Sequence, residues 1–200
     1  MKDAIHEELQ ETKEKISEEI KRYLNKNYQS NIKSLKDISY DKENKEYLSN
    51  LETSCMSYDD VIKDICKKDS ILEFASPDAI FLKNDIVYFI EFKNAKIFDK
   101  YNKEYRMKIK LKLVEGGCIG LYKLANLAGI AVEFSDIIKL KKKYLVVYNS
   151  DKATKNANNI RNHLRSKLAM QQYKGTYVED INIISSTSFD STYKSKNLWN

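Results

Sequence analysis

The sequence predicts an α/β domain in which a central mixed β-sheet is flanked by helices. Three observations lead to this fold class. Residues 3–28 carry apolar side chains at helical spacing. Residues 79–90 contain two apolar, β-branched and aromatic runs around a short polar break, which is typical of a β-hairpin. After residue 105, helical and strand patterns alternate, as they do in α/β domains.

The N-terminal third predicts helices. The amphipathic helix over 3–28 either packs against the domain or binds a second copy or a partner protein. Residues 29–46 are polar and are expected to be irregular, and a second helix is expected from about Asn44 to Ser54. A third helix should follow Ser57, because Ser57 and Asp60 resemble a capping box ahead of an apolar run.

The hairpin prediction includes a register. The run from Ile86 to Ile90 is apolar on both faces, as expected for a central strand covered on both sides. If Asn84-Asp85 is a two-residue turn, Lys83 pairs with Ile86, and counting outward brings Ala79 opposite Ile90.

The C-terminal half predicts a helix over 105–129, although residues 107–113 also alternate like a strand. Glycines 116, 117 and 120 would let that helix pack closely. A strand at 144–148, a basic helix at 153–172 and a strand at 177–184 should follow. We therefore divide the chain into an N-terminal helical extension (1–56), a core (57–184) and a polar C-terminal tail (185–200) that is expected to fray.

Composition excludes several classes of protein. The three cysteines form no CxxC pair, and their odd number argues against a disulfide framework. The charged N-terminus has no secretory apolar block, and no run approaches the ~18 apolar residues of a membrane span, so a cytoplasmic protein without a membrane partner is expected. A net charge of +6 favours polyanionic partners.

Familiar cofactor and metal motifs are missing. Two histidines, His6 and His163, are too few and too far apart for a histidine metal site. The chain has no GxxxxGK[ST] loop, which excludes a P-loop nucleoside triphosphatase.

Three charged residues around the hairpin carry the predicted chemistry. One step beyond the Ala79–Ile90 pair, Asp78 lies opposite Glu91, so the two side chains share a face with their Cβ atoms about 5 Å apart. Lys93, two residues after Glu91, leaves the strand on that same face. Adjacent carboxylates repel each other, and a divalent cation such as Mg²⁺ resolves the repulsion. A bound cation beside a lysine suits phosphodiester hydrolysis.

The segment Ser76-Pro77-Asp78, followed after twelve residues by Glu91-Phe92-Lys93, resembles the signature of the PD-(D/E)xK nuclease superfamily. The resemblance covers about residues 57–150. It implies a restriction-endonuclease-like fold and a Mg²⁺-dependent nuclease, with Mn²⁺ as a substitute ion. It also implies Asp78 and Glu91 as metal ligands, the backbone carbonyl of Phe92 as a further ligand, and Lys93 as the catalytic lysine.

Some assignments remain open at this point. Members of the superfamily often have an additional glutamate ligand on an earlier helix, and Glu52 and Glu73 are both candidates. Lys108 and Lys112 are candidates for contacts to substrate. The expected partner is nucleic acid, with DNA favoured over RNA. The alternatives are a non-catalytic nucleic-acid- or protein-binding module on the same fold, and an interaction protein in which the three charges form a surface ion cluster.

Overall fold

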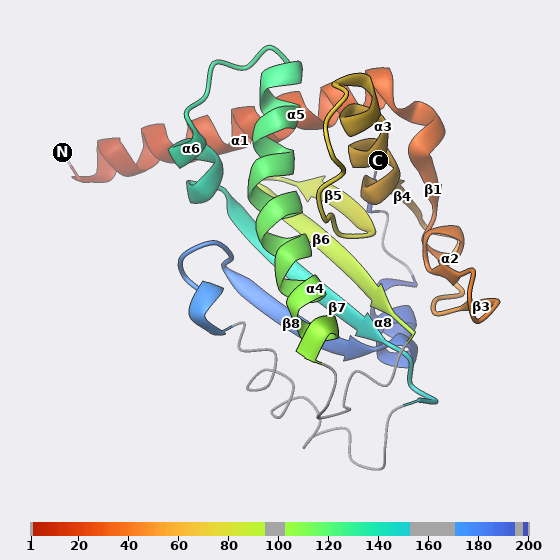
Figure 1. Ribbon diagram of the computed structural model, residues 1–200. Coiled ribbons are helices and arrows are strands. Elements are labelled where there is room, and N and C mark those ends of the chain that lie inside the picture. Colours follow the sequence, from red (N-terminus) through yellow and green to blue (C-terminus); the bar gives the residue numbers. More distant parts are fainter. Residues whose placement is uncertain (1, 95–102, 153–170, 195–197, 200) are drawn as a thin grey trace.

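The computed structural model describes residues 2–94, 103–152, 171–194 and 198–199, and within them a six-stranded sheet forms the centre of the molecule (Figure 1). Its strands, in sheet order, are β1 (Ile32–Ser34), β4 (Ser54–Ser57), β5 (Ala79–Lys83), β6 (Ile86–Lys93), β7 (Lys141–Tyr148) and β8 (Asp180–Ser185). A small separate sheet pairs β2 (Tyr40–Asp41) with β3 (Glu46–Tyr47).

Helices flank the main sheet. They are α1 (Lys2–Asn27), α2 (Leu35–Ile38), α3 (Tyr58–Lys68), α4 (Lys103–Val114), α5 (Leu121–Leu127), α6 (Phe134–Lys139) and α8 (Ser186–Tyr193). A π-helical segment, η2 (Glu115–Gly120), joins α4 to α5 in one long helix, and the short turns η1 (Gln29–Asn31) and η3 (Gln171–Tyr173) complete the described elements. Pairing is antiparallel from β1 to β6 and parallel from β6 to β8, so the predicted α/β fold with a mixed sheet is confirmed.

The hairpin register predicted from the sequence is confirmed pair by pair. Lys83 lies opposite Ile86, and the ladder continues to Ala79 opposite Ile90. Asn84 in the turn has φ of 55°, a left-handed conformation that Asn tolerates better than most residues. Strand β6 lies between β5 and β7 in the middle of the sheet. Helices cover both of its faces, which explains why its side chains are apolar on both.

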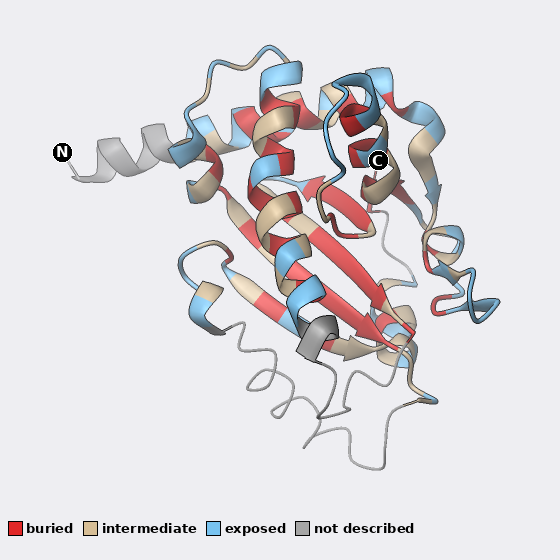
Figure 2. Ribbon diagram, viewed as in Figure 1, coloured by how far each residue is buried: buried red, intermediate tan, exposed pale blue. Residues whose placement is uncertain are grey.

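The two faces of β6 meet different helices. Phe89 packs against Tyr58 of α3, and Gly117 of η2 lies over the Phe89 ring, so the odd-numbered side chains face α3 and the α4–η2 helix. On the opposite face, Phe92 meets Phe189 of α8 edge to face. Figure 2 shows the strands between these helices as the buried centre of the molecule.

Helix α1 crosses the hairpin-turn end of the sheet, as Figure 1 shows. The amphipathic pattern places Ile16, Ile20 and Leu24 in the core. Gln10 donates to Asp85 in the hairpin turn over 2.7 Å, which ties α1 to the sheet. The predicted helix over 3–28 is therefore confirmed as a packing helix, and the hairpin-turn end that it covers is the end opposite Glu91.

Two predictions for the segment before α3 are wrong. Residues 44–54 form no helix: β3 and an irregular stretch occupy them, and Leu48 and Leu51 are buried without helical structure. The region 29–46 is less irregular than expected, since it contains β1, α2 and β2. Strand β1 and most of β4 lie within the range 1–56 that was assigned to a helical extension, yet both strands belong to the main sheet.

The helix predicted after Ser57 is present as α3, but the capping box is not. The Ser57 hydroxyl donates to the Asp60 carboxylate over 2.6 Å and makes no capping hydrogen bond to the backbone. Lys33 of β1 also binds Asp60, at 2.7 Å. The acidic side chain therefore joins β1 to α3.

The helix favoured over a strand for residues 105–129 is confirmed. Most of the basic helix predicted for 153–172 lies outside the described residues. The last strand begins at Asp180, and residues 186–193 form α8 where a frayed tail was expected, because Phe189 is buried against the sheet. Within the described ranges, no helix is long and apolar enough to cross a membrane.

Candidate functional site

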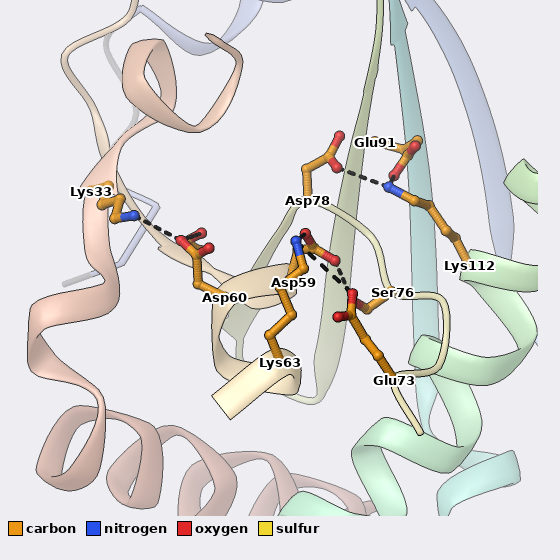
Figure 3. A network of polar contacts seen from close by, with 10 residues as sticks. Lys33, Asp59, Asp60, Lys63, Glu73, Ser76, Asp78, Glu91 and Lys112 are labelled. Carbon is orange, nitrogen blue, oxygen red and sulfur yellow. Dashed lines mark hydrogen bonds and ion pairs between the residues drawn. The ribbon is translucent and has the colours of Figure 1, made fainter. Parts of the chain in front are cut away.

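The carboxylates of Asp78 and Glu91 converge where the β5–β6 ladder ends. Asp78 directly precedes β5, and Glu91 lies in β6 one step beyond the last paired residues. The Lys112 ammonium of α4 lies 3.0 Å from Asp78 Oδ1 and 3.0 Å from Glu91 Oε2 (Figure 3). One cation therefore contacts both carboxylates, so the prediction that both side chains share one face is confirmed.

The backbone explains how Asp78 is held. Its carboxylate accepts a 2.6 Å hydrogen bond from the Phe92 N–H, and its carbonyl accepts one of 3.0 Å from the N–H of Tyr58 at the start of α3. Continuing the hairpin register would pair Phe92 with Pro77, and proline has no N–H to donate. In a strand, the N–H and the carbonyl of one residue leave on the same edge, so the Phe92 carbonyl faces the edge toward Asp78, where Pro77 has no N–H to donate to it.

Lys93 completes the cluster. Its ammonium forms an ion pair with Glu91 Oε1, so each oxygen of the Glu91 carboxylate has its own lysine. Glu91 is fully buried, whereas the side chains of Lys93 and Lys112 are 13% and 21% exposed. The Asp78 side chain is 22% exposed, so the site opens to solvent at Asp78 and at the lysines, and Glu91 forms its buried end.

Burial and the second carboxylate raise the pKa of Glu91 above its usual range. Burial alone would lower the pKa of Lys93, but Glu91 and Asp78 outweigh it and raise that pKa. The pKa of Lys112 is also raised, because the negative charges of Asp78 and Glu91 outweigh the effect of burial. Both lysines are therefore charged at neutral pH.

The loop that carries Pro77 is anchored at several points. The Glu115 carboxylate of η2 accepts a 2.6 Å hydrogen bond from the Ala75 N–H, and the buried Ser76 hydroxyl donates to Asp59 of α3 over 2.8 Å. Figure 3 shows this loop between α3 and the α4–η2 helix. A Cβ on Gly116 would lie 2.5 Å from Pro77 Cδ, so glycine is needed for the approach. These contacts fix residues 75–77, which directly precede Asp78.

Neither glutamate that was considered as an additional ligand joins the cluster. Glu52 binds Lys36 at 3.0 Å, and Glu73 lies 4.0 Å from Lys63 of α3. Among the described residues, no group of three or more His, Cys, Asp and Glu side chains gathers as a metal site. The donors available at this place are two carboxylates and the Phe92 carbonyl, and Mg²⁺ commonly takes one or two protein carboxylates with water and phosphate oxygens.

The sequence did not reveal the role of Lys112. We expected Lys108 and Lys112 to contact substrate, but Lys112 binds the two carboxylates directly. Lys108 is exposed one turn earlier on the same side of α4. A signal was available, because Lys112 comes three residues after the buried Ile109 and four residues before the buried Gly116, so it borders the inner face of the helix.

A polar cavity lies at the same end of the sheet as Glu91. Its volume is about 580 Å³, and its lining includes Asn149 and Ser150 after β7 and Ser186 and Thr187 at the start of α8. The Asn149 amide donates to the Asn94 side chain over 2.7 Å, and Asn94 directly follows Lys93. The cavity therefore lies close to the chain that follows Lys93, but Asp78, Glu91, Lys93 and Lys112 are not among its lining residues.

No family model, no curated protein and no solved structure matches this chain.

Proposed function

We propose that this protein is a Mg²⁺-dependent nuclease that hydrolyses phosphodiester bonds in nucleic acid, with DNA favoured over RNA. We further propose that its core is restriction-endonuclease-like and belongs to the PD-(D/E)xK type. One observation carries the proposal: the carboxylates of Asp78 and Glu91 converge on a single ammonium group, that of Lys112, and the Lys93 ammonium is bound to Glu91. The order α3, hairpin, α4 and β7 around them is the order that the resemblance implies.

The donor set fits a hard divalent cation. Asp78, Glu91 and the Phe92 carbonyl would hold Mg²⁺ through oxygen atoms, which are the ligands it prefers, and Mn²⁺ accepts the same donors. When bound, such an ion stabilises negative charge on a phosphoryl oxygen and favours ionisation of a bound water.

The residues of the chain would divide the remaining work. The Phe92 N–H holds one oxygen of Asp78 and so orients its carboxylate. Lys93 is charged at neutral pH, so it is suited to donate a hydrogen bond to a phosphate oxygen or to an attacking water and is unsuited to remove a proton. The exposed Lys108 would bind the phosphate backbone, and the net charge of +6 would favour the approach of nucleic acid.

A non-catalytic binding module on the same fold is the second candidate. The observation that favours it is the charge balance of the cluster, in which two lysines already neutralise two carboxylates. Such a protein would bind nucleic acid or a partner without cutting it.

A cleavage assay separates the two candidates. The purified chain is incubated with supercoiled plasmid and with RNA in Mg²⁺, in Mn²⁺ and in EDTA. We expect cleavage with either metal and none in EDTA. Asp78→Ala and Glu91→Ala should abolish it, and Lys93→Ala should lower the rate about a hundredfold, which is typical for one lost electrostatic contact in a transition state.

Matched controls make the outcome decisive. Glu19→Ala removes a carboxylate that pairs with Arg22 on α1 and should cut like the parent. Mg²⁺ should raise the melting temperature of the parent more than that of Asp78→Ala. Equal cutting by the parent, Asp78→Ala and Glu91→Ala would place the active site elsewhere, and binding without cutting would favour the second candidate.

A further inference from the structure

Lys112 lies between the carboxylates of Asp78, just before β5, and Glu91 in β6, and the proposed function gives this lysine no role of its own. Its ammonium is 3.0 Å from one oxygen of Asp78 and 3.0 Å from one oxygen of Glu91. Two carboxylate oxygens that face a common point form the position at which a divalent cation binds in proteins. Lys112 therefore lies where the cation of the proposed nuclease would bind.

We propose that Lys112 and the divalent cation compete for Asp78 and Glu91, and that Lys112 moves to a substrate phosphate when the cation binds. This inference rests on the proposed function, because it concerns the metal site of that function. It assigns Lys112 two successive partners and makes it a residue that couples metal binding to substrate binding.

Charge favours the departure of one ammonium, because its loss lowers the excess beside a bound cation from two positive charges to one. Asp78, Glu91, Lys93 and Lys112 together are neutral, and Glu91 is fully buried. Adding a cation of charge +2 beside both lysines would leave an excess of two positive charges in a poorly solvated place, which is costly. Magnesium also binds oxygen at about 2.0–2.1 Å, so an ion on the same two oxygens would take the space of the ammonium.

Lys112 is the lysine that can leave. It reaches the site from α4, opposite the strands, and its side chain is 21% exposed against 13% for Lys93. Lys93 contacts the other Glu91 oxygen, which leaves Asp78 Oδ1 and Glu91 Oε2 to the incoming ion. The lysine side chain has a flexible four-carbon stem, so the ammonium can move away from the carboxylates while α4 stays in place.

A phosphate provides the departing ammonium with a new partner. The substrate phosphate brings negative charge to the metal, and the displaced Lys112 would lie beside it, one turn from the exposed Lys108. Because metal and phosphate would each favour the same displaced position of Lys112, each should strengthen binding of the other. The bare protein should then bind metal weakly.

The test measures metal binding by the full-length chain without nucleic acid. Mn²⁺ alone is titrated by calorimetry into the parent, Lys112→Met, Lys112→Arg and the control Lys110→Met. Lys110 is on the same helix, and its removal changes the net charge by the same amount. We expect Lys112→Met to bind Mn²⁺ at least tenfold more tightly than the parent, a difference of about 1.4 kcal/mol. Lys112→Arg and Lys110→Met should stay within about twofold of the parent.

The outcomes separate this inference from the function on which it rests. If the parent binds Mn²⁺ and Lys112→Met binds it equally or more weakly, competition is refuted and the metal site stands. If no variant binds Mn²⁺, the metal site itself is refuted, and the inference with it. Should Lys112→Met fail to fold in a thermal melt, Lys112→Gln is titrated in its place, because it removes the charge and keeps a polar side chain.

Discussion

Replacing Gly116 by alanine should destabilise the protein, because this glycine lies against the loop that leads to Asp78. A Cβ at position 116 would lie 2.5 Å from Pro77 Cδ and 2.9 Å from Ser76 Cα. Carbon atoms pack at about 3.5–4.0 Å, so the added methyl would intrude by roughly 1 Å on a ring and on a backbone atom. Since backbone cannot rotate away, either the loop or η2 must move.

The size of the effect follows from two opposing terms. Overpacking of this kind costs about 1–3 kcal/mol, and replacing glycine by alanine within a helix returns about 0.5–1 kcal/mol. The difference between the two terms is a net loss of about 0–2.5 kcal/mol, with a central value of about 1 kcal/mol. For a domain of this size, the central value corresponds to a fall in melting temperature of about 2–4 °C.

Gly117→Ala is the matched control. Its Cβ would meet Phe89 at 3.5 Å and Leu113 at 3.6 Å, which are ordinary contacts, so the substitution should be neutral or mildly stabilising. Urea unfolding followed by Trp199 fluorescence measures both variants, because Trp199 is the only tryptophan and is buried. If Gly116→Ala is as stable as Gly117→Ala, the close approach of η2 to the Pro77 loop does not constrain the fold.

Two further predictions concern pH and salt. Lys142 is buried, and burial lowers its pKa from 10.5 to about 8 while its ammonium donates to the carbonyls at the end of α6. Because the unfolded chain then binds more protons between pH 8 and 10.5, the unfolding free energy of the parent should rise over that window relative to Lys142→Met, by up to about 3 kcal/mol. If the unfolding free energies of the parent and of Lys142→Met differ by the same amount at every pH from 8 to 10.5, this prediction is contradicted. The affinity for nucleic acid should fall steeply as salt rises, because phosphate contacts release counterions, and a fluorescence-anisotropy titration that stays flat between 50 and 200 mM salt would contradict it.

The hairpin and the convergence of Asp78 with Glu91 could be predicted from the sequence because they depend on local rules. A two-residue turn sets the register, and strand alternation then decides which side chains share a face. The same locality explains the success with α1, α3 and β7, whose apolar periodicity lies within single segments.

Predictions failed where distant contacts outweigh local preference. Residues 44–54 have helical spacing, yet the Ser49 hydroxyl and the Asn50 N–H both donate to Asp190 of α8, about 140 positions away, which helps to fix the segment in a non-helical path. The short β1 strand likewise depends on its pairing with β4.

By itself, the sequence determined the α/β class, the hairpin register and the meeting of two carboxylates with Lys93, because turn chemistry and the twofold period of a strand are properties of neighbouring residues. Only the tertiary structure decided that Lys112 would bridge those carboxylates. That contact depends on how closely the α4–η2 helix lies over β6. The close approach of Gly116 to Pro77 and the hydrogen bond from the Ala75 N–H to the Glu115 carboxylate hold the helix at this distance. Packing between segments that are 34 and 21 residues apart placed the ammonium of Lys112 between Asp78 and Glu91, and no local pattern encodes such a distance.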